Sequence, residues 1–210
     1  IFSSVADFNG DGYDDVFLNE SHGKPMQLWI NNAAGGFNVT VLDVPTGGLF
    51  GRPDVGDADG DGDPDIIQAY GAGGGFGSAE NRILINQGFF SGMFIDETPG
   101  RFPSEANFMS STYMKFLDYD RDDDLDIYIA NAFGAPDQIW RNDGTGRFTD
   151  VSADVLPPGN LATDEIVVCS GDMDGDGDLD LVVRGLDGTN RRFRIYRNDA
   201  GTFNLAQEPA

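Results

Sequence analysis

Short apolar runs recur along the chain between polar and glycine-rich segments. Four of them follow directly on an aspartate: Val16–Leu18, Ile66–Ile67, Ile127–Ile129 and Leu181–Val183. Runs of this length, rich in β-branched residues and bounded by turn residues, indicate β-strands rather than helices. The 29 glycines and 10 prolines supply many turns, so long helices are not expected.

A second apolar column lies further along each segment and always ends in an asparagine. Its four copies are Leu28–Asn31, Ile83–Asn86, Ile139–Asn142 and Ile195–Asn198. A glycine-containing turn follows each copy, and a phenylalanine then opens another short extended segment, at Phe37, Phe94, Phe148 and Phe203. This order predicts a hairpin after each asparagine.

Each repeat therefore contains four predicted strands in about 50 residues. A lone four-stranded sheet cannot bury both of its faces, whereas sheets stacked around an axis cover one another. We expect an all-β fold, a β-propeller of four four-stranded blades in one domain over residues 1–210, with blades at 1–48, 49–103, 104–160 and 161–210. Trp29, Trp140 and Tyr196 are expected to pack in the core. A β-sandwich or a solenoid is the alternative.

A nine-residue acidic loop ends at each of the four aspartates that precede the apolar runs. Oxygen-bearing side chains occupy loop positions 1, 3, 5 and 9, and Gly12, Gly62 and Gly177 occupy position 6 in three copies. These oxygens and the backbone carbonyl of position 7 are ligands that a hard cation such as Ca2+ takes from a short turn. The sharp turn at position 6 favours glycine with a positive φ. An EF-hand is excluded, because position 12 holds no glutamate in any copy.

We expect up to four Ca2+ ions, one in each loop. The predicted ligands are Asp7, Asn9, Asp11, Tyr13 (through its carbonyl) and Asp15; Asp57, Asp59, Asp61, Asp63 and Asp65; Asp118, Asp120, Asp122, Asp124 and Asp126; and Asp172, Asp174, Asp176, Asp178 and Asp180. The third loop departs from the pattern, since Arg121 and Asp123 replace the glycines of positions 4 and 6. It is therefore expected to be the least occupied site.

The pattern D-x-[DN]-x-D-G-x-x-D, followed by an apolar strand, an "LWxN" column and "G-x-F", resembles the FG-GAP/VCBS repeat family over essentially the whole chain. The resemblance implies a β-propeller like those of integrin α-subunits, secreted lectins and bacterial surface proteins. It also implies that calcium lies in the turn between the first two strands of each blade and has a mostly structural role. The ligand is left open by the family pattern.

The net charge of -23 argues against nucleic acid and anionic membranes as partners, because such a surface repels phosphates. More than half of the acidic residues lie in the four loops, where cations would neutralise them. No stretch approaches the roughly 18 to 20 apolar residues of a membrane span, so membrane insertion is not expected. The single cysteine, Cys169, is expected to be a small buried hydrophobe. The chain begins at Ile1 without a signal-like segment, and we interpret it as a processed or excised piece.

Calcium-dependent rigidity without disulfides predicts an extracellular or cell-surface setting. The loops that vary in length lie on the face opposite the calcium loops, and variable loops on a rigid scaffold often carry binding function. Tyr70–Gly77, Gly47–Phe50 and Phe133 are candidate contacts for a glycan or protein ligand, or else connectors that pack between blades. Arg191, Arg192, Arg194 and Arg197 either capture an anionic group or pair with neighbouring aspartates.

The sequence therefore predicts a calcium-binding module for recognition or adhesion, whose partner is an extracellular glycan or protein. A structural or self-assembling surface component, and the non-catalytic propeller portion of a larger secreted enzyme, are the alternatives. Catalysis is not expected, because the one histidine, His22, has no recognisable serine or cysteine partner pattern. Four blades allow a small ring, an arc of a longer propeller, or half of a two-chain ring.

Overall fold

The structure, a computed structural model, describes residues 2–20, 24–44, 49–71, 80–88, 94–104, 107, 110–132, 134–158, 167–187 and 190–207. Within these residues the chain is all-β, as expected, with two short helices.

Repeat 1 contains β1 (Phe2–Ala6), β2 (Asp15–Asn19), β3 (Gln27–Asn31) and β4 (Phe37–Val41). Repeat 2 contains β5 (Leu49–Gly56), β6 (Asp65–Gly71), β7 (Arg82–Asn86) and β8 (Phe94–Asp96), followed by α1 (Thr98–Arg101). Repeat 3 contains β9 (Ser111–Leu117), β10 (Asp126–Asn131), β11 (Gln138–Asn142) and β12 (Phe148–Asp150), followed by α2 (Ser152–Val155). Repeat 4 contains β13 (Val167–Gly171), β14 (Asp180–Asp187), β15 (Asn190–Asn198) and β16 (Phe203–Gln207).

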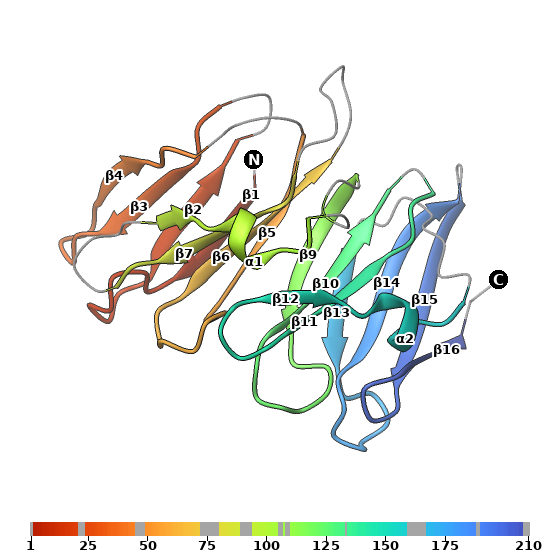
Figure 1. Ribbon diagram of the computed structural model, residues 1–210. Coiled ribbons are helices and arrows are strands. Elements are labelled where there is room, and N and C mark those ends of the chain that lie inside the picture. Colours follow the sequence, from red (N-terminus) through yellow and green to blue (C-terminus); the bar gives the residue numbers. More distant parts are fainter. Residues whose placement is uncertain are drawn as a thin grey trace.

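Each repeat is an antiparallel sheet whose strands pair in the order of the sequence. The sheets stand in a row from β1–β4 to β13–β16, and the four acidic loops project from the same edge of that row, the lower edge in Figure 1. The first strands of repeats 2 and 3 also pair in parallel, through Arg52 and Tyr113. Gly51 permits this approach, because a Cβ at this position would lie 2.4 Å from the carbonyl oxygen of Thr112.

Neighbouring sheets pack face to face through side chains that alternate along the second strands. Three apolar clusters lie between successive repeats, and each unites two side chains that are fully buried: Phe17 with Ile66, Ile67 with Ile127, and Tyr128 with Leu181. Since successive side chains of a strand point to opposite faces, repeats 2 and 3 are buried on both faces. Each sheet thus has one face for the preceding repeat and one for the following repeat.

Two expectations about buried residues are wrong, and both for the same reason. Trp140 and Tyr196 are buried as predicted, but Trp29 in the same column is only half-buried. Cys169 is exposed, although its neighbour Val168 is buried. Among the residues that the structure describes, no other sheet packs on the face of repeat 1 that carries Trp29, or on the face of repeat 4 that carries Cys169. Neither helix of the described residues is long and apolar enough to cross a membrane.

Candidate metal centre and neighbouring grooves

The last aspartate of each acidic loop joins the loop to the third strand of its sheet. In repeat 2, the two carboxylate oxygens of buried Asp65 accept hydrogen bonds from the backbone N–H groups of Ala58, at 2.9 Å, and Asn86, at 2.8 Å. The equivalent bonds join Asp15 to Phe8 and Asn31, Asp126 to Tyr119 and Asn142, and Asp180 to Met173 and Asn198. Position 9 therefore holds the loop closed through the protein's own hydrogen bonds.

The first aspartate of each loop folds the backbone around its carboxylate. Asp57 accepts hydrogen bonds from the N–H groups of Gly60, at 2.8 Å, and Gly62, at 2.9 Å. Asp7, Asp118 and Asp172 accept equivalent bonds from their own loops. The glycines of position 6 have positive φ angles of 87°, 93° and 90° at Gly12, Gly62 and Gly177, as the sequence predicted. These turns bring side chains of positions 1, 3 and other loop positions close together in repeats 2, 3 and 4.

Carboxylate oxygens converge in three of the four loops. Within the described residues, groups whose oxygens lie within 4.8 Å of one another are Asp57, Asp59 and Asp61; Asp118, Asp120, Asp122 and Asp126; and Asp172, Asp174 and Asp180. The first loop has Asn9 at position 3, and the Nδ2 of Asn9 donates to Asp11 at 3.0 Å. In all four repeats the predicted residues lie in one short turn. Among the described residues, three or more carboxylates converge only in repeats 2, 3 and 4.

Two buried oxygens in these groups have no hydrogen-bond partner. They are the Oδ1 atoms of Asp59 and Asp120, which occupy position 3 of the second and third loops. A buried carboxylate oxygen without a donor is costly, and a cation bound by the neighbouring carboxylates would satisfy it. The donor set, which consists of oxygens only, fits Ca2+ in preference to softer metals.

The third loop is geometrically the most complete, although its sequence departs furthest from the pattern. Arg121 and Asp123 adopt positive φ angles of 63° and 70° and so take up the turns that glycines make elsewhere. The loop unites four carboxylates, the largest of the three groups. The backbone of the third loop therefore matches that of the other loops, and its expected lower occupancy stays a prediction.

The electrostatics of the loops favour a bound cation. Burial raises the pKa of Asp65 and of Asp126 to about 7, against the lowering effect of their backbone hydrogen bonds. Burial, followed by the charge of Asp61, raises the pKa of Asp59, and burial followed by the charge of Asp122 raises that of Asp120. Burial thus disfavours the charged form of these carboxylates, and a nearby positive charge would favour it.

The side chains at position 7 do not belong to the converging groups. Tyr13 is half exposed. Asp124 lies against Gly144, where an added Cβ would meet its Oδ2 at 2.7 Å, and Asp178 accepts a hydrogen bond from the N–H of Ala200 at 3.0 Å. Position 7 thus offers a cation only its backbone carbonyl, the role that the sequence assigned to it.

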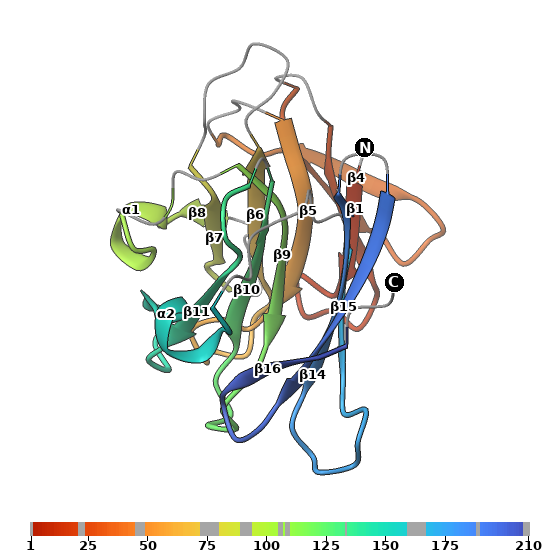
Figure 2. The ribbon, with the colours of Figure 1, turned by 90° about the vertical axis from the view of Figure 1, so that its right-hand side faces the viewer.

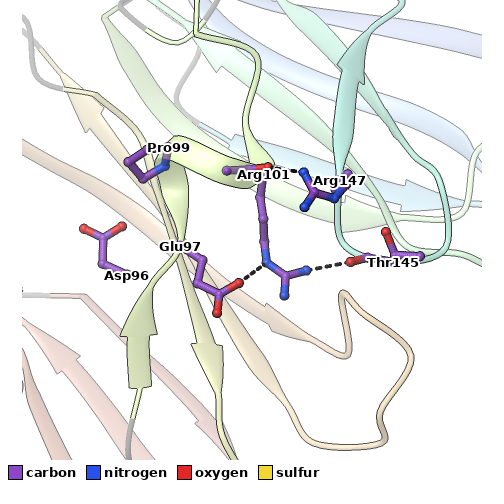
Figure 3. A pocket seen from close by; sticks show the side chains of 7 residues that line it. Asp96, Glu97, Pro99, Arg101, Thr145 and Arg147 are labelled. Carbon is purple, nitrogen blue, oxygen red and sulfur yellow. Dashed lines mark hydrogen bonds and ion pairs between the residues drawn. The ribbon is translucent and has the colours of Figure 1, made fainter.

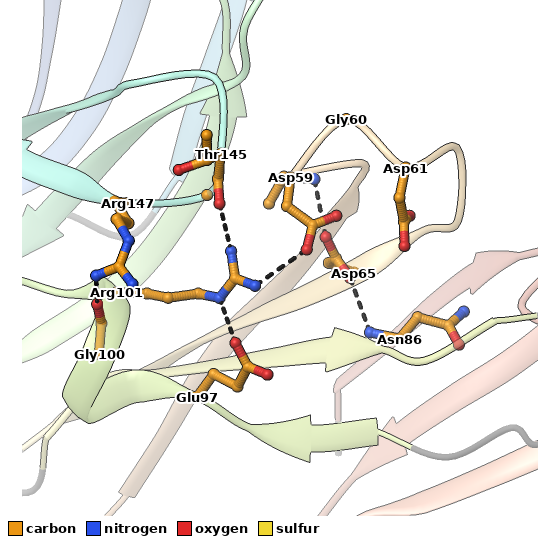
Figure 4. Close-up of polar contacts among 12 residues, drawn as sticks. Asp59, Gly60, Asp61, Asp65, Asn86, Glu97, Gly100, Arg101, Thr145 and Arg147 are labelled. Atoms are coloured by element: carbon orange, nitrogen blue, oxygen red, sulfur yellow. Dashed lines mark hydrogen bonds and ion pairs between the residues drawn. The ribbon is translucent and has the colours of Figure 1, made fainter.

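Two arginines, which the sequence pattern did not single out as contacts, bind loops of neighbouring repeats together. Arg101, at the end of α1, donates to Asp59 at 3.0 Å, to Glu97 at 2.7 Å and to the carbonyl oxygen of Thr145 at 2.6 Å (Figure 4). Arg121 of the third loop likewise donates to backbone carbonyls of the fourth loop and pairs with Asp178 at 2.7 Å. Neighbouring loops are therefore coupled by guanidinium groups.

Replacing Arg101 with methionine is expected to destabilise the fold by about 2–4 kcal/mol, because the half-buried carboxylates of Asp59 and Glu97 and the exposed carbonyl of Thr145 lose their donor. Chemical denaturation of Arg101→Met measures the change. Arg101→Lys is the matched control: it keeps the charge but cannot satisfy three acceptors in one plane, so an intermediate loss is expected. Equal stability of all three proteins would contradict the bridging role.

Arg101 also borders a groove of about 560 Å3 on the outer side of repeats 2 and 3. The groove is lined by Asp96, Glu97, Pro99, Gly100, Arg101, Thr145 and Arg147 (Figure 3). Arg147 donates to the carbonyl oxygen of Gly100 at 2.8 Å and so joins its two walls. The mixture of charged side chains, backbone groups and a proline surface suits a polar ligand with flat apolar patches.

A second groove, of about 730 Å3, lies in the equivalent place between repeats 3 and 4, beside α2. Asp137, Ser152, Pro157 and Asn204 are among its lining residues. Figure 2 shows α1 and α2 on the same side of the molecule. The short helices after the fourth strands thus mark two related grooves between repeats.

Asp137 makes stability depend on pH. Burial raises its pKa from 3.8 to about 7, although it accepts hydrogen bonds from the Tyr128 hydroxyl and the Asn131 N–H. Because the pKa is higher in the folded state, its contribution is fully present below about pH 4 and is lost as the pH rises through about 7. From pH 4 to pH 8, Asp137→Asn should therefore gain stability relative to the unchanged protein by on the order of 4 kcal/mol. Denaturant titrations of both proteins at each pH measure the difference, and a constant difference would contradict it.

The structure describes only some of the candidate ligand contacts that the sequence predicted on the face opposite the acidic loops. Residues 45–48, 72–79 and 133, with most of the proposed loops, lie outside the described residues. Of the four clustered arginines, Arg197 pairs with Asp174 at 2.6 Å and Asp199 at 3.2 Å. For Arg197, pairing with neighbouring aspartates is confirmed. The side chains of Arg191 and Arg192 lie outside the described part of the chain.

The model of the FG-GAP-like repeat matches residues 7–67 and 118–183, which is more than half of the chain. The chain belongs to the FG-GAP-like repeat family. Both matched segments begin at the first aspartate of an acidic loop, and the same loop and strand order recurs in repeats 2 and 4. The FG-GAP-like resemblance drawn from the sequence is thereby confirmed. No curated protein sequence matches the chain.

Solved structures with the same fold come from three unlike proteins. A lectin from Agrocybe aegerita, described as recognising non-reducing terminal N-acetylglucosamine, is 20% identical with a TM-score of 0.59, over 98% of this chain and 50% of the lectin chain. The V. cholerae biofilm matrix protein Bap1 is 15% identical with a TM-score of 0.57, over 99% of this chain and 28% of the other. The Photorhabdus luminescens Tc holotoxin pore is 18% identical with a TM-score of 0.52, over 99% and 9%. This FG-GAP-like chain thus spans half or less of the chains it resembles.

Proposed function

We propose that the chain forms four blades of a β-propeller, each with a structural Ca2+ ion between its first and second strands. The observation that carries this proposal is the pair of buried, unpartnered oxygens of Asp59 and Asp120 within converging carboxylates. The ligands would be the side chains of positions 1, 3, 5 and 9 and the carbonyl of position 7. When bound, the ion would supply positive charge to loops that otherwise hold several carboxylates within a few ångströms.

Isothermal titration calorimetry tests the metal proposal directly. Up to four Ca2+ ions per chain are expected to bind, and Asp120→Asn should remove one of them. Asp124→Asn, which alters a half-buried carboxylate of the same loop outside the converging group, should leave the number of ions unchanged. Absence of heat in the wild-type titration, together with no displacement of Ca2+ indicator dye, would reject the proposal.

We further propose that the module acts in recognition or adhesion outside the cell, without catalysis, and that its ligand is a glycan. The groove beside Arg147, with its polar walls, is the described surface best suited to a sugar. The likeness to a lectin and to a biofilm matrix protein agrees with this role, and calcium as a structural ion agrees with an extracellular setting. A protein ligand on the same scaffold is the second candidate.

A glycan array probed with the calcium-loaded chain tests recognition. Binding that is lost in Arg147→Ala but kept in Lys24→Ala would support the groove, because both variants remove one exposed positive charge. Lys24 belongs to repeat 1, at a distance from the groove. No binding to any glycan by a chain that binds calcium would reject glycan recognition while leaving the metal proposal intact.

A further inference from the structure

The side chain of Arg101 lies between the second acidic loop and the groove beside α1, and it contacts both. Its Nη2 donates to the Oδ2 of Asp59, at position 3 of the loop, at 3.0 Å. Its Nη1 donates to the carbonyl oxygen of Thr145 at 2.6 Å, and its Nε donates to Glu97 at 2.7 Å. Thr145 and Glu97 line the groove, and Figure 4 shows the guanidinium between them and the loop. One planar group thus joins the candidate calcium site to the groove.

The two carboxylate oxygens of Asp59 have different surroundings. The Oδ2 accepts the hydrogen bond from Arg101, whereas the Oδ1 is buried and has no hydrogen-bond partner among the described residues. Asp59 also belongs to the converging group of the second loop, with Asp57 and Asp61. A guanidinium that donates to one oxygen fixes the orientation of the whole carboxylate. Arg101 therefore orients Asp59 in a way that leaves its second oxygen for a cation.

The guanidinium of Arg101 is closely surrounded. The side chain is only 14% exposed. A Cβ added to Gly146 would lie 2.1 Å from the Nη1 of Arg101 and 3.1 Å from the Cβ of Asp59, so a glycine is needed where this turn approaches. Gly146 also has a positive φ of 74°, which glycine adopts without strain. A displacement of Asp59 is therefore expected to displace the turn as well.

Two arginines join α1 to this turn of repeat 3 from opposite sides. Arg101 of α1 donates to the turn at Thr145, and Arg147 of the turn donates to the carbonyl oxygen of Gly100 in α1 (Figure 3). Among the contacts of the described residues, only Arg101 continues from the groove to an acidic loop. The order of the groove wall thus depends on what holds this one side chain.

The second groove, beside α2, provides a comparison within the same chain. The helix α2 ends in Val155, where α1 ends in Arg101. The position 3 aspartate of the third loop, Asp120, lies against a glycine of the next repeat as in the second loop, since a Cβ added to Gly201 would lie 3.4 Å from the Cβ of Asp120. A valine cannot donate to a carboxylate. The third loop therefore has the same neighbours as the second but lacks a charged connection from α2.

We propose that Arg101 is a positioning residue that couples calcium in the second loop to the order of the groove beside α1. The ion fixes Asp59, Asp59 fixes the guanidinium, and the guanidinium fixes the turn at 143–147. Without the ion, the like charges of the converging carboxylates favour opening of the loop, and Arg101 loses one of its three acceptors. By linkage, a sugar that binds the ordered groove must strengthen calcium binding by the same factor. This coupling rests on the calcium sites and the groove of the proposed function.

Hydrogen–deuterium exchange of the turn at 143–147 tests the coupling, with calcium alone as the probe. The N–H of Gly146 donates to the Oδ1 of Asn142 at 2.9 Å, so its exchange reports opening of the turn. Asp61→Asn weakens the second site, while its amide oxygen can still accept from the N–H of Asp63. At a Ca2+ concentration where calorimetry counts one ion fewer on Asp61→Asn, exchange of the turn should be at least ~10-fold faster than in the wild type.

A double-mutant cycle shows whether Arg101 transmits this effect. In Arg101→Met the turn should exchange fast with the second ion bound, and adding Asp61→Asn should change the rate by less than ~2-fold. Arg101→Lys keeps the charge but cannot hold three acceptors in one plane, so it should retain only about a third of the wild-type response. A full response in Arg101→Lys would assign the effect to charge alone and overturn the positioning role. Arg101→Lys also carries the test if circular dichroism shows that Arg101→Met is unfolded.

Arg197→Met is the matched control. Arg197 pairs with Asp174, the position 3 aspartate of the fourth loop, at 2.6 Å and with Asp199 of its own repeat at 3.2 Å. Its removal therefore takes an arginine from an equivalent aspartate without touching the groove beside α1. The response of the turn at 143–147 to Asp61→Asn should remain at least ~10-fold in this variant.

The outcomes separate this coupling from the proposed function. If the wild type binds calcium at the second loop and the turn does not respond to Asp61→Asn, the coupling is wrong and the metal proposal stands. An equal response in the wild type and in Arg101→Met also overturns the coupling, because another route would then carry the effect. If calorimetry detects no calcium on the wild type, the metal proposal and the coupling fail together.

Discussion

Removing calcium is expected to lower the thermal unfolding midpoint by about 10 °C or more. An ion that binds only the folded chain stabilises it by about 2.7 kcal/mol per site at a concentration 100 times its Kd, and each kcal/mol shifts the midpoint of a chain this long by about 2–4 °C. Burial first, and then the charges of Asp61 and Asp122, raise the pKa values of Asp59 and Asp120, and a bound cation would oppose both causes. Differential scanning fluorimetry in 1 mM Ca2+ and in excess EGTA measures the shift.

Magnesium is the control for this experiment. Mg2+ requires a tighter octahedral arrangement and dehydrates reluctantly, so at equal concentration it should restore only a small part of the shift. Equal midpoints in Ca2+ and EGTA would show that the carboxylate groups hold no ion that matters for folding. Equal restoration by Mg2+ would assign the effect to general charge screening.

Substitutions of two aspartates of the third loop are expected to differ strongly in how much stability they remove without calcium, and this is the second large effect. Asp126 is fully buried, and its oxygens accept bonds from Tyr119 and Asn142 at 3.2 and 2.8 Å. In EGTA, Asp126→Ala should destabilise the chain by about 3–5 kcal/mol, because two buried N–H groups lose their acceptor. Asp120→Ala should cost less than about 1 kcal/mol in EGTA, because the buried Oδ1 of Asp120 has no donor to lose and one of several like charges disappears.

In Ca2+ both losses are expected to be larger, and Asp126→Ala remains the more destabilising change. Asp120→Ala should lose the calcium stabilisation of the third loop, about 2–4 kcal/mol, and Asp126→Ala should lose this in addition to its hydrogen bonds. Denaturant titrations of both variants in the two buffers give the four values needed. If the two variants lose equal stability in EGTA, the hydrogen bonds of the aspartate at position 9 do not stabilise the loop, and this residue acts only as a metal ligand.

These two aspartates also show which features of the site could be predicted from the sequence. The spacing of oxygens was enough to place Asp118, Asp120, Asp122 and Asp126 in one group, because all four lie within nine residues of one turn. The bonds from position 9 to the asparagine column could not be read from spacing, since they join residues 16 to 21 positions apart through the pairing of strands. The sequence showed that an asparagine recurs at the end of the third strand. That its side chain joins successive repeats could be seen only once the sheets were packed together.

The burial of the tryptophans and the partners of two arginines depend on contacts between neighbouring repeats, which the sequence does not show. Trp29 and Trp140 occupy the same place in their repeats, yet only Trp140 is buried, because a preceding sheet covers it. Arg101 and Arg121 gain their partners from loops of neighbouring repeats, and nothing local to either arginine signals this.

The sequence by itself determined the all-β class, the four repeats, the acidic loops and the positive φ angles of their glycines, because each depends on residues close together in the chain. Only the tertiary structure decided which oxygens lack a donor and where the grooves between repeats lie. The physical reason is that the side chains of a strand point alternately to the two faces of its sheet. Each face is buried only where a neighbouring sheet packs on it.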